Sequence, residues 1–196
     1  MNVATPPAPV RTRERLLAAA SDLIAAEGWA AVTMGKLAAH VGVSRQTVYN
    51  ELGSKAELAE ALVLRETGRF TERVTEVVAA YPGHPVDGVT AAFGQTLEAA
   101  RGNPLLVVAL GCPKGGRDDF LPLLTTRSEG VLERSVDTVA AVFARCYPEV
   151  RLSPSEWTVA VEAIVRLLLS HLVQPSGSVE HATGQMRWVI GRMLGA

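Results

Sequence analysis

The chain has 196 residues, of which 48% are hydrophobic, and its formal net charge is −1. This length and apolar content are enough to fill a hydrophobic core, which excludes a wholly disordered chain, and the near-zero charge argues against a protein coated in nucleic acid. Two cysteines without a C-x-x-C pair argue against a disulfide scaffold and a zinc module and fit a reducing cytoplasm, and the absence of an 18-residue apolar run excludes a membrane span.

The small net charge hides an asymmetry between the two ends of the chain. Residues 1–56 contain six Lys and Arg against four Asp and Glu, whereas the remainder contains 13 basic and 16 acidic residues. A mildly basic N-terminal part on an acidic body suits a small DNA-reading surface.

The first predicted elements are a tail and a helix. Residues 1–10 contain three prolines and no apolar run, so we expect a flexible tail there and not a signal peptide. Helical spacing of Leu16, Ala20 and Ile24 then predicts an amphipathic helix that ends at Gly28.

Two short helices are predicted next, one after Thr33 and one opening at Ser44. Ala38 and Gly42 supply the small residue and the turn glycine that a helix-turn-helix unit needs, four positions apart, and Ser44 can cap the second helix. The alternative is an ordinary pair of short helices in a bundle.

The rest of the chain is predicted to be helical as well, without an internal repeat. Capping boxes at Ser54–Glu57 and Ser153–Glu156 open two long helices, and the second of these is the most apolar in the chain. The remaining predicted elements are a breaker at Tyr81–Pro85, a helix to Arg101, a short helix over Pro104–Leu110, an irregular loop over Cys112–Asp119, a helix from about Leu124 that stops before Pro148, and a last helix to about Leu194. Together they predict an all-α protein of about nine helices.

Three stretches carry a resemblance to a known family. They are R-E-R-L-L-A-A-A-S-D-L-I-A-A-E-G-W, then T-M-G-K-L-A-A-H-V-G-V-S-R-Q-T-V-Y-N, then S-K-A-E-L. In order and spacing they resemble the DNA-binding head of the tetracycline-repressor (TetR) family, over roughly Arg11 to Leu62. The resemblance implies a three-helix helix-turn-helix domain over residues 11–56 and a ligand-binding and dimerisation domain over residues 57–196. It also implies a homodimer held together by the last two helices, which binds palindromic DNA in the cytoplasm.

The resemblance assigns DNA contacts to individual residues. Positions that usually contact phosphates are Thr33, Ser44, Thr47, Tyr49 and Lys55, and those that usually read bases are Arg45, Gln46 and Asn50. The side-chain chemistry agrees, because Arg suits guanine, Gln and Asn suit adenine, and hydroxyl and ammonium groups suit phosphates. Arg11 and Arg13 could reach the backbone or minor groove as an N-terminal arm.

Two positions depart from the family pattern. Members commonly carry His and Phe where this chain has Glu51 and Leu52. Leu52 can still pack into the head, whereas a carboxylate near phosphates must turn away or pair with Lys55.

A small apolar effector is expected in the regulatory domain, since the family places its pocket among helices four to eight. The candidate ligand-binding residues there are Phe70, Val77, Phe93, Leu97, Leu105, Val108, Leu124, Val131 and Trp157. Each is also a candidate core residue. Few polar groups accompany them, which favours an apolar ligand.

The chain is therefore interpreted as a transcriptional repressor released by a ligand. We expect no cofactor, no metal and no enzymatic activity, because the four histidines lack metal-ligand spacing and no catalytic signature is present. Two alternatives stay open: a DNA-binding regulator without small-molecule control, and a helical dimeric interaction module with a vestigial head.

Overall fold

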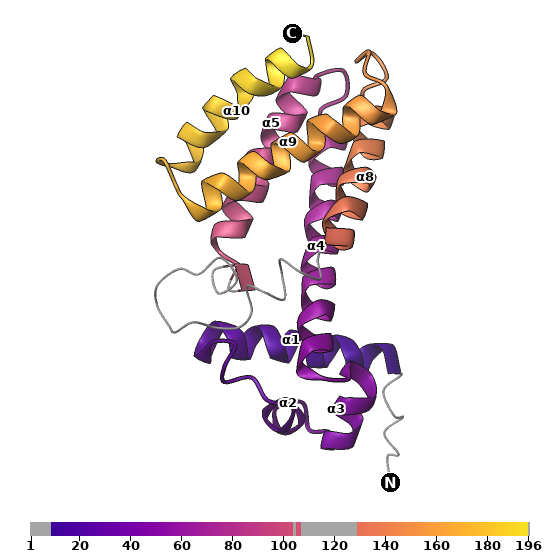
Figure 1. Cartoon of the computed structure of the whole chain (residues 1–196), viewed down its shortest axis with the longest axis vertical. Coiled ribbons are helices and arrows are strands. Elements are labelled where there is room, and N and C mark those ends of the chain that lie inside the picture. Colours follow the sequence, from indigo (N-terminus) through magenta and orange to yellow (C-terminus); the bar gives the residue numbers. More distant parts are fainter. Residues whose placement is uncertain (1–8, 104, 107–128, 196) are drawn as a thin grey trace. The chain divides into compact units, whose positions relative to one another are not determined.

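The computed structural model describes residues 9–103, 105–106 and 129–195. These residues form eight α-helices and no β-strand, which confirms the all-α prediction (Figure 1). The helices are α1 Pro9–Glu27, α2 Met34–Val41, α3 Arg45–Leu52, α4 Lys55–Ala79, α5 Pro85–Arg101, α8 Glu129–Cys146, α9 Pro154–Val173 and α10 Val179–Met193.

The chain divides into two compact units. Among the described residues, 9–65 with 105–106 form one unit, here called the head, and 66–103 with 129–195 form the other, here called the body. Helix α4 contributes its first part to the head and its second part to the body.

Most predicted helix ends agree with the structure, because short-range signals set them. Both capping boxes are present: the Ser54 N–H donates to Glu57 Oε2 (2.7 Å), and the Ser153 N–H donates to Glu156 Oε2 (2.7 Å). Helix α1 begins at Pro9, inside the stretch predicted as a tail. Residues 107–110, the loop 112–119 and the start of the helix predicted from Leu124 lie outside the described residues.

The head is held together by one apolar cluster. The predicted stripe of α1 lies inward, with Leu16, Ala20 and Ile24 almost fully buried. Leu37 of α2 and Val48 of α3 have no exposed surface and fill the space between the two helices. The small core thus fixes α3 against α1 and α2.

The body has a separate core built from α5, α8, α9 and α10 with the end of α4. Helix α10 packs along α5, where Gly94 lies against Thr183, and Trp157 of α9 meets the Phe143 ring of α8 edge-on at 5.8 Å. The Tyr147 hydroxyl donates to the Val78 carbonyl (3.2 Å).

Gly88 of α5 allows this approach of the Tyr147 hydroxyl. A β-carbon at position 88 would lie 1.9 Å from the hydroxyl oxygen. Only glycine at this position therefore leaves room for the tyrosine as it is packed.

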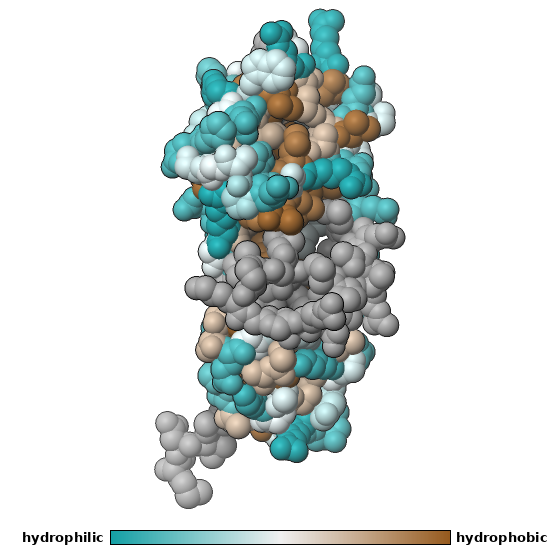
Figure 2. All heavy atoms as spheres, turned by 60° about the vertical axis from the view of Figure 1, so that its left-hand side comes forward, coloured by the Kyte–Doolittle hydropathy of each residue, from teal (hydrophilic) through white to brown (hydrophobic). Residues whose placement is uncertain are grey.

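The body also exposes apolar side chains on α9 and α10. Trp188 is 67% exposed, Val159 66% and Val173 60%, and Figure 2 shows apolar surface among hydrophilic side chains of this unit. A single exposed apolar side chain is ordinary, whereas a contiguous apolar patch marks an interaction surface.

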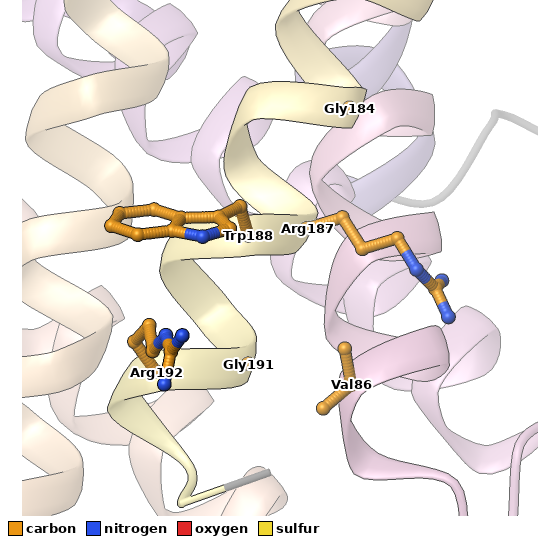
Figure 3. Close-up of a pocket in the computed structure, with 6 residues that line it drawn as sticks. All are labelled: Val86, Gly184, Arg187, Trp188, Gly191 and Arg192. Carbon is orange, nitrogen blue, oxygen red and sulfur yellow. The ribbon is translucent and has the colours of Figure 1, made fainter.

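A surface hollow of about 490 Å³ lies beside Trp188 (Figure 3). Gly184, Trp188 and Gly191 are spaced by four and three residues and share one face of α10. Arg192 lies near the indole, with Cζ 5.8 Å from the ring centroid, and Arg187 turns toward α5, where it pairs with Asp87 at 2.6 Å.

Candidate nucleic-acid interface

The turn between α2 and α3 has the geometry of a helix-turn-helix unit. Gly42 lies in the left-handed region (φ 75°, ψ 40°), where its N–H donates to the Ala38 carbonyl at 3.0 Å. The Val43 N–H donates to the same carbonyl at 3.0 Å. A residue with a β-carbon would be strained at Gly42, so the sequence uses glycine to end α2 sharply.

Side-chain caps fix the start of each of the two helices. Thr33 accepts a hydrogen bond from the Lys36 N–H (3.2 Å), and Ser44 accepts one from the Thr47 N–H (3.0 Å). Both hydroxyl residues are exposed and lie at helix N-termini, where backbone N–H groups favour an anion. The predicted phosphate contacts Thr33, Ser44 and Thr47 therefore lie at positions suited to a phosphate group.

Helix α3 has a buried inner face and an exposed outer face. Val48 and Leu52 are buried, whereas Tyr49 is 52% exposed. The other exposed predicted contacts on this helix are Arg45, Gln46 and Asn50. Gln46 Nε2 donates to Asn50 Oδ1 at 2.9 Å, so the two amides lie together on the outer face.

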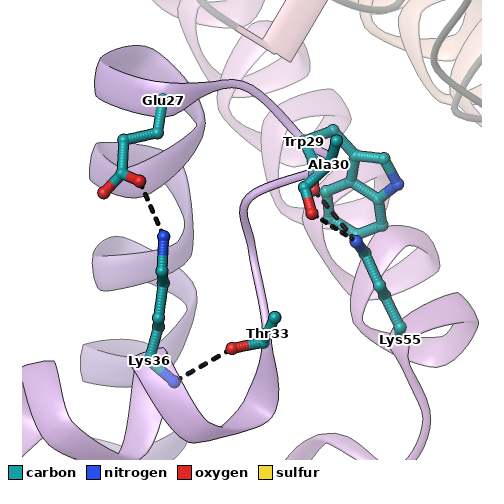
Figure 4. Close-up of polar contacts among 6 residues, drawn as sticks. All are labelled: Glu27, Trp29, Ala30, Thr33, Lys36 and Lys55. Atoms are coloured by element: carbon teal, nitrogen blue, oxygen red, sulfur yellow. Dashed lines mark hydrogen bonds and ion pairs between the residues drawn. The ribbon is translucent and has the colours of Figure 1, made fainter.

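Most cations of the head whose side chains are described are held by the protein itself. Arg13 donates to the Glu51 carbonyl, Arg15 to the Val41 carbonyl (2.9 Å), and Lys36 pairs with Glu27 at 2.7 Å (Figure 4). Arg45 forms no hydrogen bond and no ion pair within the described part of the chain.

Lys55 has a role that the sequence did not reveal. Its Nζ lies 3.0 Å from the Trp29 carbonyl oxygen and 3.5 Å from that of Ala30, and 4.8 Å from the centroid of the Trp29 ring (Figure 4). The ammonium group thus ties the start of α4 to the turn after α1. It satisfies these carbonyls instead of pairing with Glu51, one of the two possibilities that the sequence left open. The signal that could have suggested this was the aromatic Trp29 directly after Gly28.

The predicted ligand-binding residues that the structure describes are divided between the two units. Val77, Phe93, Leu97 and Trp157 belong to the core of the body, and Phe70 is half-buried on α4. Leu105 instead packs in the core of the head. Val108 and Leu124 lie outside the described residues, as does the side chain of Val131 in α8 and that of Arg11 in α1.

The apolar stripes of α9 and α10 are divided between interior and surface. Trp157 and Val161 are buried, and Leu168 packs against the core of its own body. The exposed apolar residues are instead Val159, Leu167, Val173 and Trp188. Helical periodicity in the sequence does not distinguish the buried set from the exposed one.

Comparison with known families identifies both parts of the chain. A family model described as bacterial regulatory proteins of the tetR family matches residues 16–62, and one described as the C-terminal domain of the bacterial tetracycline repressor matches residues 85–192. The chain belongs to the TetR family. It is therefore a DNA-binding transcriptional regulator, and the interaction module with a vestigial head is not supported.

Individual relatives agree with this assignment. The chain is 32% identical over 164 residues to the HTH-type transcriptional regulator AlkX of Mycobacterium tuberculosis H37Rv. This match covers 83% of this chain and 75% of the relative. It is 33% identical over 76 residues to the HTH-type transcriptional repressor AcnR of Corynebacterium efficiens, covering 39% of this chain and 40% of that one. The crystal structure of the TetR family repressor AlkX from Dietzia sp. strain DQ12-45-1b has the same fold, with a TM-score of 0.76, 24% identity, and coverage of 92% of this chain and 96% of that one.

Ligand control is typical of this family, whose members are generally not enzymes. Across the described ranges, no group of three or more His, Cys, Asp and Glu side chains is arranged to hold a metal ion. None of the described helices is long and apolar enough to span a membrane.

Proposed function

We propose that this regulator is a homodimeric repressor that acts in the cytoplasm and leaves a palindromic operator when it binds a small apolar ligand. The outer face of α3 carries the proposal, because Arg45 is exposed there without a partner in the described residues. A guanidinium group that the protein does not use is available to the O6 and N7 atoms of guanine.

The neighbouring residues complete a reading surface in this proposal. Gln46 and Asn50 each carry a side-chain amide, and the two amides are hydrogen-bonded to each other. If either amide rotates away, its donor and acceptor become available to adenine. Tyr49, Lys55 and the capping hydroxyl groups would bind the phosphates on either side, as would Arg13. An ammonium group has three N–H donors and a guanidinium group has five, so the carbonyls that Lys55 and Arg13 already satisfy leave donors for DNA.

The proposed homodimer covers the exposed face of α9 and α10. Val159, Arg166 and Val173 are spaced by seven residues and share one face of α9, and Arg166 is already paired with Glu162 at 2.6 Å. On α10, Trp188 projects between Gly184 and Gly191, and a β-carbon at either glycine would have nothing within 4 Å. A twofold axis can place the indole of one protomer over the glycine face of its partner, because the same patch meets itself.

Two heads are needed for the proposed operator. Helix-turn-helix dimers read half-sites separated by about 34–36 Å, one helical turn of DNA. The domain division in this proposal is a DNA-binding domain over residues 11–56 and a ligand-binding and dimerisation domain over residues 57–196.

An apolar ligand is proposed from the composition of the body. Four of the predicted ligand-binding residues belong to the apolar core of the body, namely Val77, Phe93, Leu97 and Trp157. A ligand that enters among them would be surrounded by hydrocarbon side chains, which suits an apolar molecule. The mycobacterial relative shares the name AlkX with the Dietzia repressor, which is described as implicated in the biodegradation of n-alkanes. Both observations support a hydrocarbon-like effector.

The test uses a duplex selected by the protein from a random library, and series of alkanols, alkanoic acids and alkyl esters of increasing chain length. Each added methylene should raise affinity about fourfold, from ~0.8 kcal/mol of burial, until the site is full. The same order should govern release of the duplex, since a ligand shifts the equilibrium only by its differential affinity for the two states.

Succinate, a compact charged molecule, is the comparison compound. Stabilisation by succinate with no response to any alkyl series would overturn the apolar-ligand proposal. Tight DNA binding that no compound alters would instead identify a regulator without small-molecule control.

A further inference from the structure

The side chain of Arg45 lies against an empty position on the preceding helix. A β-carbon at Gly35 of α2 would be 2.9 Å from Arg45 Nη2, 3.1 Å from Nε and 3.2 Å from Cζ. The guanidinium group therefore occupies the space that any other residue at position 35 would fill with its side chain.

The fold of α2 does not itself require glycine at this position. Gly42 needs its left-handed φ of 75°, but Gly35 lies within the helix and is absent from the positive-φ glycines. Glycine inside a helix is less favourable than alanine, because it loses more backbone entropy on folding. What Gly35 supplies is room for the Arg45 side chain.

The orientation of Arg45 does not come from a polar partner in the described part of the chain. Among the described residues it has neither a hydrogen bond nor an ion pair, and Gly35 lies in the first turn of α2, where the helix dipole disfavours a cation. The guanidinium group can lie against α2 in this direction because Gly35 leaves room for it there.

We propose that Gly35 is a specificity-determining residue of DNA recognition, although it lies on α2 and not on the recognition helix α3. By leaving room beside α2, it sets the direction from which Arg45 meets the base edges. This inference rests on the proposed base-reading role of Arg45. A bidentate contact depends on direction, so a β-carbon at position 35 should reduce base discrimination without removing a charge.

The experiment compares Gly35→Ala with Gly68→Ala, a matched exchange in α4 where a β-carbon would have nothing within 4 Å. Affinity is measured for the duplex selected by the wild-type protein and for a scrambled duplex of the same length. Gly35→Ala should lower the ratio of the two affinities by about five- to tenfold, within the range of one bidentate contact. Scrambled DNA should be bound as before, and Gly68→Ala should leave the ratio unchanged.

Two further measurements separate this role from a structural one. The melting temperature of Gly35→Ala should not fall, because alanine favours the helix and the flexible end of Arg45 can move aside. In an Arg45→Ala background, Gly35→Ala should cause no additional loss of discrimination.

The outcomes that overturn the inference are distinct from failure of the proposed function. The role of Gly35 is refuted, and the proposed function left intact, if Gly35→Ala leaves the affinity ratio unchanged. The same holds if Gly35→Ala still lowers the ratio in the Arg45→Ala background. Arg45→Ala with full discrimination refutes the base-reading role of Arg45, and the inference about Gly35 with it.

Discussion

The exposed indole of Trp188 gives the sharpest test of the proposed homodimer. A tryptophan buries up to roughly 250 Å², and 67% of Trp188 is exposed in the single chain. Roughly 170 Å² per protomer can therefore be covered, worth about 4 kcal/mol at 25 cal/mol per Å², or about 8 kcal/mol for two copies.

Association recovers only part of this gain, because ordering the interface and restricting the two chains cost free energy. If about a third of the ~8 kcal/mol is retained as dimer stability, Trp188→Ala should weaken the dimer by about 2–3 kcal/mol. This is a rise of about 30- to 150-fold in the dimer Kd. The indole is absent from the core of its own body, so the monomer should keep its fold.

Sedimentation equilibrium over a concentration series measures this change directly. Leu64→Ala is the control, because it removes another exposed apolar side chain, 46% exposed on α4 in the head. Operator binding by Trp188→Ala should fall at concentrations where the wild type is dimeric. A dimer Kd unchanged within twofold would place the interface elsewhere and refute the reasoning. A charge at Leu168 would not test it, since that residue packs against its own core.

Three further predictions concern packing, the titration of Tyr147 and phosphate binding. Gly88→Ala should destabilise the protein by about 1–3 kcal/mol in urea unfolding, because its β-carbon would overpack against the Tyr147 hydroxyl at 1.9 Å. Adding Tyr147→Phe should recover part of that loss, because this change removes the hydroxyl. Burial raises the pKa of Tyr147 from 10.0 to about 12, so above pH 10 the unfolded chain loses this proton first and stability should fall with rising pH up to about 12. Tyr147→Phe should lack that component, and an identical pH profile would argue against it. Lys55→Ala should cost roughly 1–2 kcal/mol by removing the charge-assisted hydrogen bond to the Trp29 carbonyl, which keeps the Val32 N–H as a donor at 3.1 Å. It should also flatten the slope of log K against log salt by about one per half-site, and an unchanged slope would restrict Lys55 to its structural role.

Short-range signals in the sequence are enough to predict the local elements of this protein. Helix ends are set by contacts between residues three or four positions apart, as for the capping hydroxyl groups of Ser44 and Ser153 and the turn glycine Gly42. Such signals can be recognised in the sequence without knowledge of the fold. The helix-turn-helix unit was predictable for the same reason, whereas the place of Arg45 on its outer face was implied by the family resemblance.

Which partner each side chain meets depends on how the helices pack together. An apolar stripe on a helix is wide enough to serve either a core or an interface, and periodicity alone did not separate buried Trp157 from exposed Trp188. Leu105 joins the core of the head, and Lys55 turns to the carbonyl of Trp29, 26 residues earlier in the chain. Contacts over such separations depend on how helices pack against one another, and no short-range pattern encodes them.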